Sequence, residues 1–166
     1  MVDKDTLSYK RGFAKGIRRN IMSYHTWHIY GYGIKTSDIT DLTVDKLKTF
    51  IHLAPNYETV FNEWLRNCDI TEPTLEDYLE CDENECYGIA GIMREVILEC
   101  EDIDFTACND FDGIQYLLYE PLYPWQITTK NENLTSDKLS DIIKKYLKYL
   151  TDEEIDIDYY GAANGG

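Results

Sequence analysis

Residues 87–119, with the sequence YGIAGIMREVILECEDIDFTACNDFDGIQYLLY, change their hydrophobic period once, and this change indicates the fold class. Up to residue 100 the apolar residues recur at intervals of three and four, which places them on one face of an α-helix. Beyond residue 102 apolar and polar residues alternate, as in a half-buried strand, and a glycine-bearing loop at 109–113 interrupts the alternation. The stretch therefore predicts a helix over 87–100 followed by a β-hairpin over 103–119.

The residues after this hairpin complete the prediction for the C-terminal part. Two prolines between 120 and 125 favour an extended segment over a helix. Thr135 is a suitable N-cap for a long amphipathic helix over 136–150, and an alternating segment at 155–159 predicts a third strand before a glycine-rich, flexible end. We expect an α+β fold in which a small antiparallel sheet packs against the helices 87–100 and 136–150.

The N-terminal part is predicted to be mostly helical. One helix is expected near the start, where apolar residues recur every four positions between residues 9 and 21. Thr43 can cap a short second helix that is closed by Pro55, and Asn56 can cap a third. The aromatic and glycine-rich segment 23–34 is a poor helix and fits a short extended piece or a turn.

Charge divides the chain into two parts. The 166 residues include 16 Lys or Arg and 31 Asp or Glu, a net charge of −15. Residues 1–66 carry 10 basic and 7 acidic side chains, or +3, whereas residues 67–166 carry 6 basic and 24 acidic ones, or −18. We therefore distinguish a mildly basic helical part, 1–66, from an acidic α+β part, 67–166, and the two could form one continuous domain.

Most of the negative charge lies in residues 69–112, the acidic stretch, which holds 15 carboxylates and one arginine. Acidity of this density repels nucleic acid and attracts basic protein surfaces. Thr74 and Asp77 have the spacing of a helix capping box, so a rigid helical turn is expected to carry part of the charge. The alternative is a hydrated surface that serves only solubility. The predicted partner is a basic protein, and the predicted contact residues are Glu72, Glu76, Glu80, Asp82, Glu83, Glu85, Asp110 and Asp112.

The predicted first helix has a basic face opposite its apolar stripe, and aromatic residues follow it between 24 and 30. Basic side chains beside aromatic rings suit phosphate contact combined with base stacking. The alternative is a solvated face that offsets the acidic remainder of the chain. The residues considered for nucleic-acid contact are Arg11, Lys15, Arg18 and Arg19.

No metal site or cofactor is predicted. The loop 109–113 resembles a calcium loop, but Cys108 and Tyr119 would occupy the first and last ligand positions, so a hairpin turn is the better interpretation. Cys81 and Cys86 have a spacing found in some metal sites, yet no second Cys or His pair follows at the distance of a zinc finger.

The sequence lacks the signatures of several other functional classes. His25 and His28 are better interpreted as histidines packed among aromatic rings than as metal ligands. No glycine-rich phosphate loop, nucleophile elbow or zinc-protease motif is present, so no catalytic residue is predicted. The five cysteines are odd in number and fit reduced packing residues. Without a long apolar run or a signal peptide, the expected location is the cytoplasm.

The stretch CNDFDGIQYLLYEPLYPW at 108–125, together with the tail from residue 156 to residue 166, resembles small acidic accessory proteins of phages and integrative elements. The resemblance covers about residues 86–166. It implies a non-enzymatic inhibitor of defence in the cytoplasm of a bacterial host, of the anti-CRISPR or anti-restriction type. Through protein–protein interaction such an inhibitor either occupies a nucleic-acid site as a nucleic-acid mimic or locks an effector. The basic first helix departs from a uniformly acidic mimic, and could contact the RNA or DNA of the effector.

Two alternatives from other classes remain. One is a small regulatory nucleic-acid-binding module that uses the basic helix. The other is an enzyme whose active site has no recognisable motif, since a fold does not determine a function.

Overall fold

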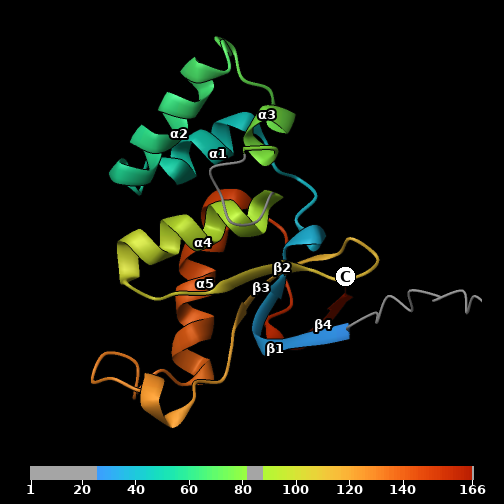
Figure 1. Cartoon of the computed structure of the whole chain (residues 1–166). Helices are drawn as coiled ribbons and strands as arrows, with labels where there is room; N and C mark the ends of the chain where they lie inside the picture. Colours follow the sequence, from blue (N-terminus) through green and yellow to red (C-terminus); the bar gives the residue numbers. More distant parts are fainter. Residues whose placement is uncertain (1–25, 82–87, 166) are drawn as a thin grey trace, which may run out of the picture.

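The computed structural model describes residues 26–81 and 88–165. In this part of the chain five α-helices accompany one four-stranded antiparallel sheet, which confirms the α+β class (Figure 1). The strands are β1 (Thr26–Lys35), β2 (Thr106–Asn109), β3 (Gln115–Tyr119) and β4 (Asp158–Gly165). The helices are α1 (Val44–Ile51), α2 (Pro55–Asn67), α3 (Leu75–Leu79), α4 (Gly88–Glu101) and α5 (Ser136–Leu150), with short 3-10 turns η1 (Thr36–Asp38) and η2 (Pro124–Gln126).

β1 lies inside the sheet, whose strand order is β2-β3-β1-β4. It pairs antiparallel with β3, where Tyr32 lies opposite Tyr119, and with β4, where Tyr32 lies opposite Tyr159. The sequence did not predict this strand, because Gly31 and Gly33 interrupt its aromatic residues and glycine is depleted in strands. A strand from residues 1–66 thus lies between strands that belong to residues 67–166.

Two glycines allow β1 to approach β3 very closely. A Cβ atom on Gly33 would lie 1.9 Å from the carbonyl oxygen of Leu117, and one on Gly31 would lie 2.6 Å from the carbonyl oxygen of Tyr119. Any larger residue at either position would force the two backbones apart, so only glycine is compatible with this close pairing of β1 and β3.

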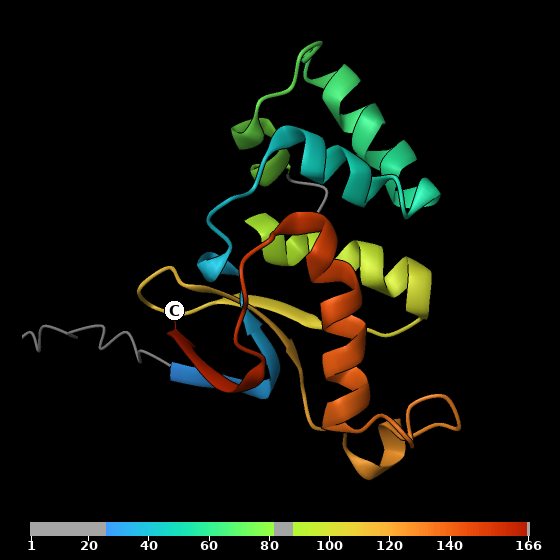
Figure 2. The ribbon, with the colours of Figure 1, turned by 180° about the vertical axis from the view of Figure 1, so that it is seen from behind.

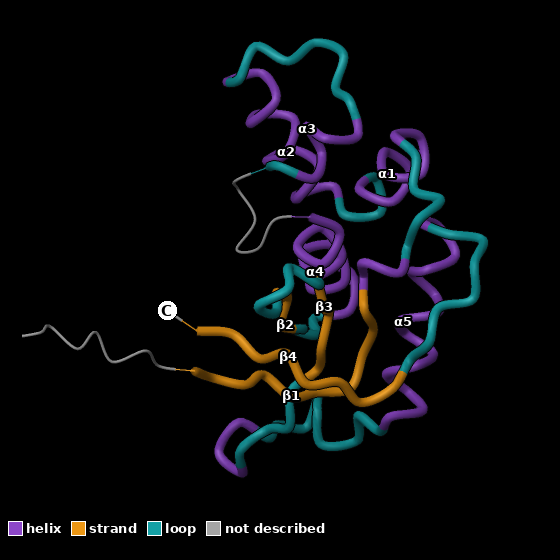
Figure 3. The backbone as a smooth tube through the Cα atoms, turned by 90° about the vertical axis from the view of Figure 1, so that its right-hand side faces the viewer, coloured by secondary structure: helices purple, strands orange, loops and turns teal. Residues whose placement is uncertain are grey.

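Hydrogen bonds also join the two edge strands of the sheet, β2 with its following turn and β4. The Phe111 amide donates to the Ala163 carbonyl at 3.0 Å, and the Asn164 side-chain amide donates to the Asn109 carbonyl at 2.8 Å. The sheet is therefore curled, and the turn between β2 and β3 contacts β4, which runs beside β1 (Figure 3). On the side away from the helices a second small cluster is buried, formed by Cys108, Tyr116, Leu118 and Ala162.

The main core lies between the sheet and the helices. α4 and α5 pack on one face of the sheet, and α1, α2 and α3 lie on the far side of α4 (Figures 1 and 2). Ile34 of β1, Leu117 of β3, Val96 of α4 and Ile143 of α5 are fully buried in this core. Burial of such side chains contributes about 1.5–3 kcal/mol each, which makes this contact the main source of stability.

Most predicted elements are present. α4, α5 and the hairpin of β2 and β3 match the ranges predicted from the hydrophobic period, apart from small shifts at their ends. The two threonine caps are also confirmed, since the Thr43 hydroxyl accepts from the Lys46 amide and the Thr135 hydroxyl accepts from the Lys138 amide.

Two local predictions were wrong. The helix capped by Thr43 ends at Ile51, before Pro55, as predicted, but Asn56 is not the N-cap of α2. That helix begins one residue earlier, at Pro55, and proline suits its first position because the first helical N–H needs no partner. The third strand starts at Asp158, three residues later than predicted, and it includes the glycine-rich end that was expected to be flexible. Ile155 and Ile157 pack against the core from a loop instead.

The approach of β1 to β3 can be tested with Gly33→Ala. The added methyl would overlap the Leu117 carbonyl, so we expect the free energy of unfolding to fall by about 3 kcal/mol or more in urea denaturation. Gly161→Ala is the matched control on β4, where the nearest atom to a Cβ lies 3.8 Å away, and its effect should stay within about 1 kcal/mol. Similar stabilities for the two variants would contradict the close approach.

Candidate partner-binding surface

The predicted acidic contact surface includes a short projecting helix, α3. The Thr74 hydroxyl accepts from the Asp77 amide, and the Asp77 carboxylate accepts from the Thr74 amide and hydroxyl at 2.7 Å each, which confirms the capping box. These bonds, led by the one from the Thr74 amide, lower the pKa of Asp77. On the other side of α3, Tyr78 is buried and stacks on Phe61 at 4.8 Å. The capping box thus closes the first turn of α3, and Tyr78 holds the helix against α2.

Three carboxylates of this region are exposed to solvent, namely Glu72, Glu76 and Glu80. Within the described residues, none of the three side chains has a hydrogen bond or an ion pair. We call this group the α3 carboxylates. The predicted contact residues Asp82, Glu83 and Glu85 follow closely in the sequence but lie outside the described residues.

The other two predicted contact residues lie in the turn between β2 and β3, and they differ in role. Asp110 accepts from the amides of Asp112 and Ile114 at 2.9 Å each and from the Tyr116 hydroxyl at 3.1 Å. Burial and this bond raise the pKa of Tyr116 to about 12. Asp110 is thus used to build the turn, whereas Asp112 is exposed. The turn and α3 lie on the same side of the molecule (Figures 1 and 2).

A further carboxylate of the acidic stretch caps a neighbouring helix. α2 begins after Ala54, which has no side chain able to accept a hydrogen bond. Glu99 of α4 takes this role, because its carboxylate accepts from the Asn56 amide at 3.0 Å and from the Tyr57 amide at 2.9 Å. The negative charge also faces the positive end of the α2 dipole. Glu99 therefore joins α4 to α2 and is not available to a partner.

Other carboxylates of the acidic stretch, in and just after α4, pair with side chains of the same protein. Glu101 accepts from Lys145 at 2.5 Å and from the Tyr146 hydroxyl at 2.6 Å. Burial alone would raise the pKa of Glu101, but these two bonds outweigh it and leave the pKa below its usual value. Arg94, the single basic residue of the stretch, pairs with Glu95 at 2.9 Å and with Asp104 at 3.0 Å. The negative charge of the acidic stretch is thus partly neutralised by basic side chains of the same protein.

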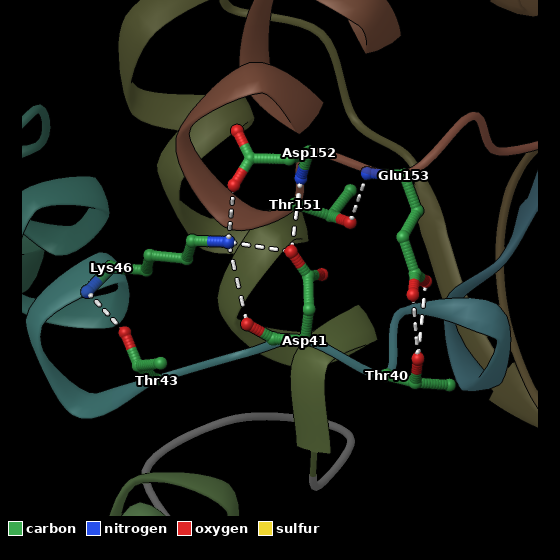
Figure 4. Close-up of polar contacts among 7 residues, drawn as sticks. All are labelled: Thr40, Asp41, Thr43, Lys46, Thr151, Asp152 and Glu153. Carbon is green, nitrogen blue, oxygen red and sulfur yellow. Dashed lines mark hydrogen bonds and ion pairs between the residues drawn. The ribbon is translucent and has the colours of Figure 1, made fainter.

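A second polar network ties the linker after η1 to the end of α5 (Figure 4). Asp41 accepts from Lys46 at 2.6 Å and from the Asp152 amide at 3.1 Å, and Lys46 also contacts the Asp152 carboxylate at 3.1 Å. The hydrogen bond from Lys46 is the main cause of a pKa of Asp41 well below its usual range. Sequence reasoning missed this network, because its members are up to 111 residues apart and no local motif connects them.

The remaining predicted residues are less constrained by the structure. Arg11, Lys15, Arg18 and Arg19, and the helix predicted for them, lie outside the described residues, as do His25 and Cys86. His28 is exposed on β1, so its interpretation as a packed histidine was wrong. Of the cysteines considered as packing residues, Cys81 and Cys108 are buried, but Cys68 and Cys100 are exposed.

Over the described ranges, the structure contains no group of three or more His, Cys, Asp or Glu side chains that could hold a metal ion. No helix in those ranges has both the length and the apolar character needed to cross a membrane. Comparison with known proteins finds no match to this chain among family models, curated proteins or solved structures.

The division of the carboxylates into structural and available groups can be tested by alanine substitution. Glu99→Ala removes the cap of α2, so we expect the free energy of unfolding to fall by about 1–2 kcal/mol. Glu76→Ala removes an exposed side chain from α3 and should change it by less than about 0.5 kcal/mol. Urea denaturation at neutral pH measures both values, and equal losses would contradict the division.

The network of Asp41 predicts a dependence of stability on pH. Its pKa is lower in the folded than in the unfolded protein, so its contribution is present above the unfolded value of about 3.9 and is lost as pH falls toward the folded value. Asp41→Asn should therefore be less stable than the natural protein at pH 7, and the difference should narrow as pH falls from about 5 to about 2. A difference that does not depend on pH, in denaturant titrations across this range, would contradict the assignment.

Proposed function

We propose that the protein is a non-enzymatic inhibitor from a phage or mobile element, which binds a basic surface of a host nucleic-acid-targeting defence effector, most concretely a CRISPR–Cas effector. The α3 carboxylates, with Asp112, supply the contact. Occupation of a basic groove by these groups would exclude the nucleic acid that the groove normally binds.

The observation that carries this proposal is the difference between the α3 carboxylates and the rest of the acidic stretch. Glu95, Glu99 and Glu101 are all used by the fold, whereas Glu72, Glu76 and Glu80 are exposed and, within the described residues, unpaired. Exposed charges that solubilise a protein need no fixed position. Here a capping box and the stacked Tyr78 hold the supporting helix, so its charges are presented on a rigid element.

The net charge of the acidic part also favours a basic protein over nucleic acid as the partner. Residues 67–166 have a net charge of −18, and such a surface repels phosphate groups. A basic groove is attracted over a distance of about one Debye length, roughly 8–10 Å at physiological ionic strength. Electrostatic attraction of this kind raises the association rate more than it slows dissociation.

The proposal is tested by charge reversal with a matched control. The triple substitution Glu72→Lys, Glu76→Lys and Glu80→Lys should weaken effector binding at least tenfold, mainly through the association rate, measured by biolayer interferometry. The control triple Asp137→Lys, Asp141→Lys and Glu154→Lys makes the same change of net charge at exposed positions on and after α5, and should weaken it less than threefold. Thermal melting confirms that both variants fold.

Effectors for this measurement are obtained by capture from bacterial lysates that carry defence systems, and purified without nucleic acid. Raising salt from about 50 to about 500 mM should slow association with the natural protein by roughly tenfold or more. Added guide RNA or target DNA should compete. Salt-independent binding, or equal losses in the two triples, would overturn the acidic contact.

A further inference from the structure

A pocket lies between the sheet and the segment that joins β3 to α5. This segment is at the end of the molecule opposite α3 (Figure 1). The volume of the pocket is about 280 Å³. This is slightly below the roughly 300–1,000 Å³ of pockets that hold drug-sized ligands, so it suits one long side chain better than a whole cofactor. Its position does not overlap the α3 carboxylates, and the inference drawn from it is independent of the proposed function.

Three tyrosines from three different strands line this pocket: Tyr32 of β1, Tyr119 of β3 and Tyr159 of β4. They share a face because Tyr32 lies opposite both of the others in the strand register. The rings of Tyr32 and Tyr159 meet edge to face at 5.0 Å, and Tyr30 stacks on the outer side of Tyr159 at 5.8 Å. The faces of aromatic rings carry partial negative charge, so a pocket lined by tyrosines can attract a cation.

Two carboxylates, Glu120 and Glu132, lie among the lining residues, and no lysine, arginine or histidine does. The Glu120 carboxylate is already used, because it accepts from the Thr106 hydroxyl of β2. Among the described residues the Glu132 side chain has no hydrogen bond or ion pair, so Glu132 is the carboxylate that is available to a ligand. The remaining lining includes apolar side chains such as Ile127. The lining therefore combines negative charge, aromatic faces and apolar walls, which complements a ligand with an alkyl stem and a cationic head.

The segment beside the pocket presents further apolar surface on a rigid turn. Tyr123 and Trp125 stack in parallel at 4.7 Å and are 61% and 78% exposed. Asn131 closes the turn by accepting from the Thr128 amide at 2.6 Å and donating to the Gln126 carbonyl at 3.0 Å. Large aromatic side chains that the fold leaves exposed next to a pocket are typical of protein-binding hot spots.

We propose that this pocket receives an arginine side chain from a protein partner, and that apolar residues beside that arginine pack on Tyr123 and Trp125. Arginine fits better than lysine, because a guanidinium group is planar, stacks on aromatic rings, is weakly hydrated and can bond two carboxylate oxygens at once. Here the rings are those of Tyr32, Tyr119 and Tyr159, and the carboxylate is that of Glu132.

The test uses a short glycine- and serine-rich peptide with one central arginine flanked by leucines, titrated into the isotopically labelled full chain and followed by NMR. Saturable shifts should appear at Tyr32, Tyr119, Ile127 and Tyr159. The same peptide with citrulline, which has nearly the same shape without the charge, should bind at least about tenfold more weakly, and the lysine peptide several-fold more weakly.

Two variants separate the pocket from the general acidity of the chain. Tyr159→Leu keeps the net charge and should weaken binding of the arginine peptide by about fivefold or more. Glu132→Gln and Asp141→Asn each remove one negative charge, but only the first lies in the pocket, so only the first should weaken binding.

The proposal is overturned if citrulline binds as well as arginine, or if the shifts spread over the acidic surface and Tyr159→Leu has no effect. Equal binding of the lysine peptide would overturn the assignment to arginine. The charge-reversed α3 variant is not part of this measurement, so a failed effector contact and a failed arginine pocket remain distinguishable.

Discussion

The close approach of the β1 backbone to β3 is the constraint on which the rest of the structure depends. Gly31 and Gly33 have no Cβ, and in their place lie the carbonyl oxygens of Tyr119 and Leu117. Because side chains alternate across a strand, these glycines leave one face of β1 bare and place its tyrosines on the other face. The sheet can then curl until the turn between β2 and β3 bonds to β4.

Residues on this face of β1 lie in two different environments, according to their position along the strand. Ile34, at one end of β1, is fully buried in the core beneath the helices. Tyr32, nearer the middle of the strand, meets Tyr159 at the pocket beside the segment that joins β3 to α5. A single strand thus supplies one buried residue of the core and one of the three tyrosines that line the pocket.

The carboxylates of this acidic chain have different physical roles. Glu99 satisfies the first amides of α2, Asp110 closes the hairpin turn, and Asp41 joins the ends of two distant segments through Lys46. Each replaces hydration by directed hydrogen bonds, so its charge is largely used within the fold. α3 and the segment that joins β3 to α5, which lines the pocket, lie at opposite ends of the molecule (Figure 1). The two proposed contacts therefore use separate surfaces.

The sequence by itself determined the α+β class, the helices α4 and α5, the hairpin and the threonine caps, because hydrophobic period and capping are local properties of the chain. Only the tertiary structure decided that residues 26–35 and 158–165 are paired strands, since glycine-rich segments become strands through a partner far away in the sequence. The tertiary structure also decided which carboxylates are available to a binding partner. Glu76 and Glu99 look alike in an acidic sequence, but only Glu99 lies against the amide groups of another helix, and that contact depends on how α2 and α4 pack.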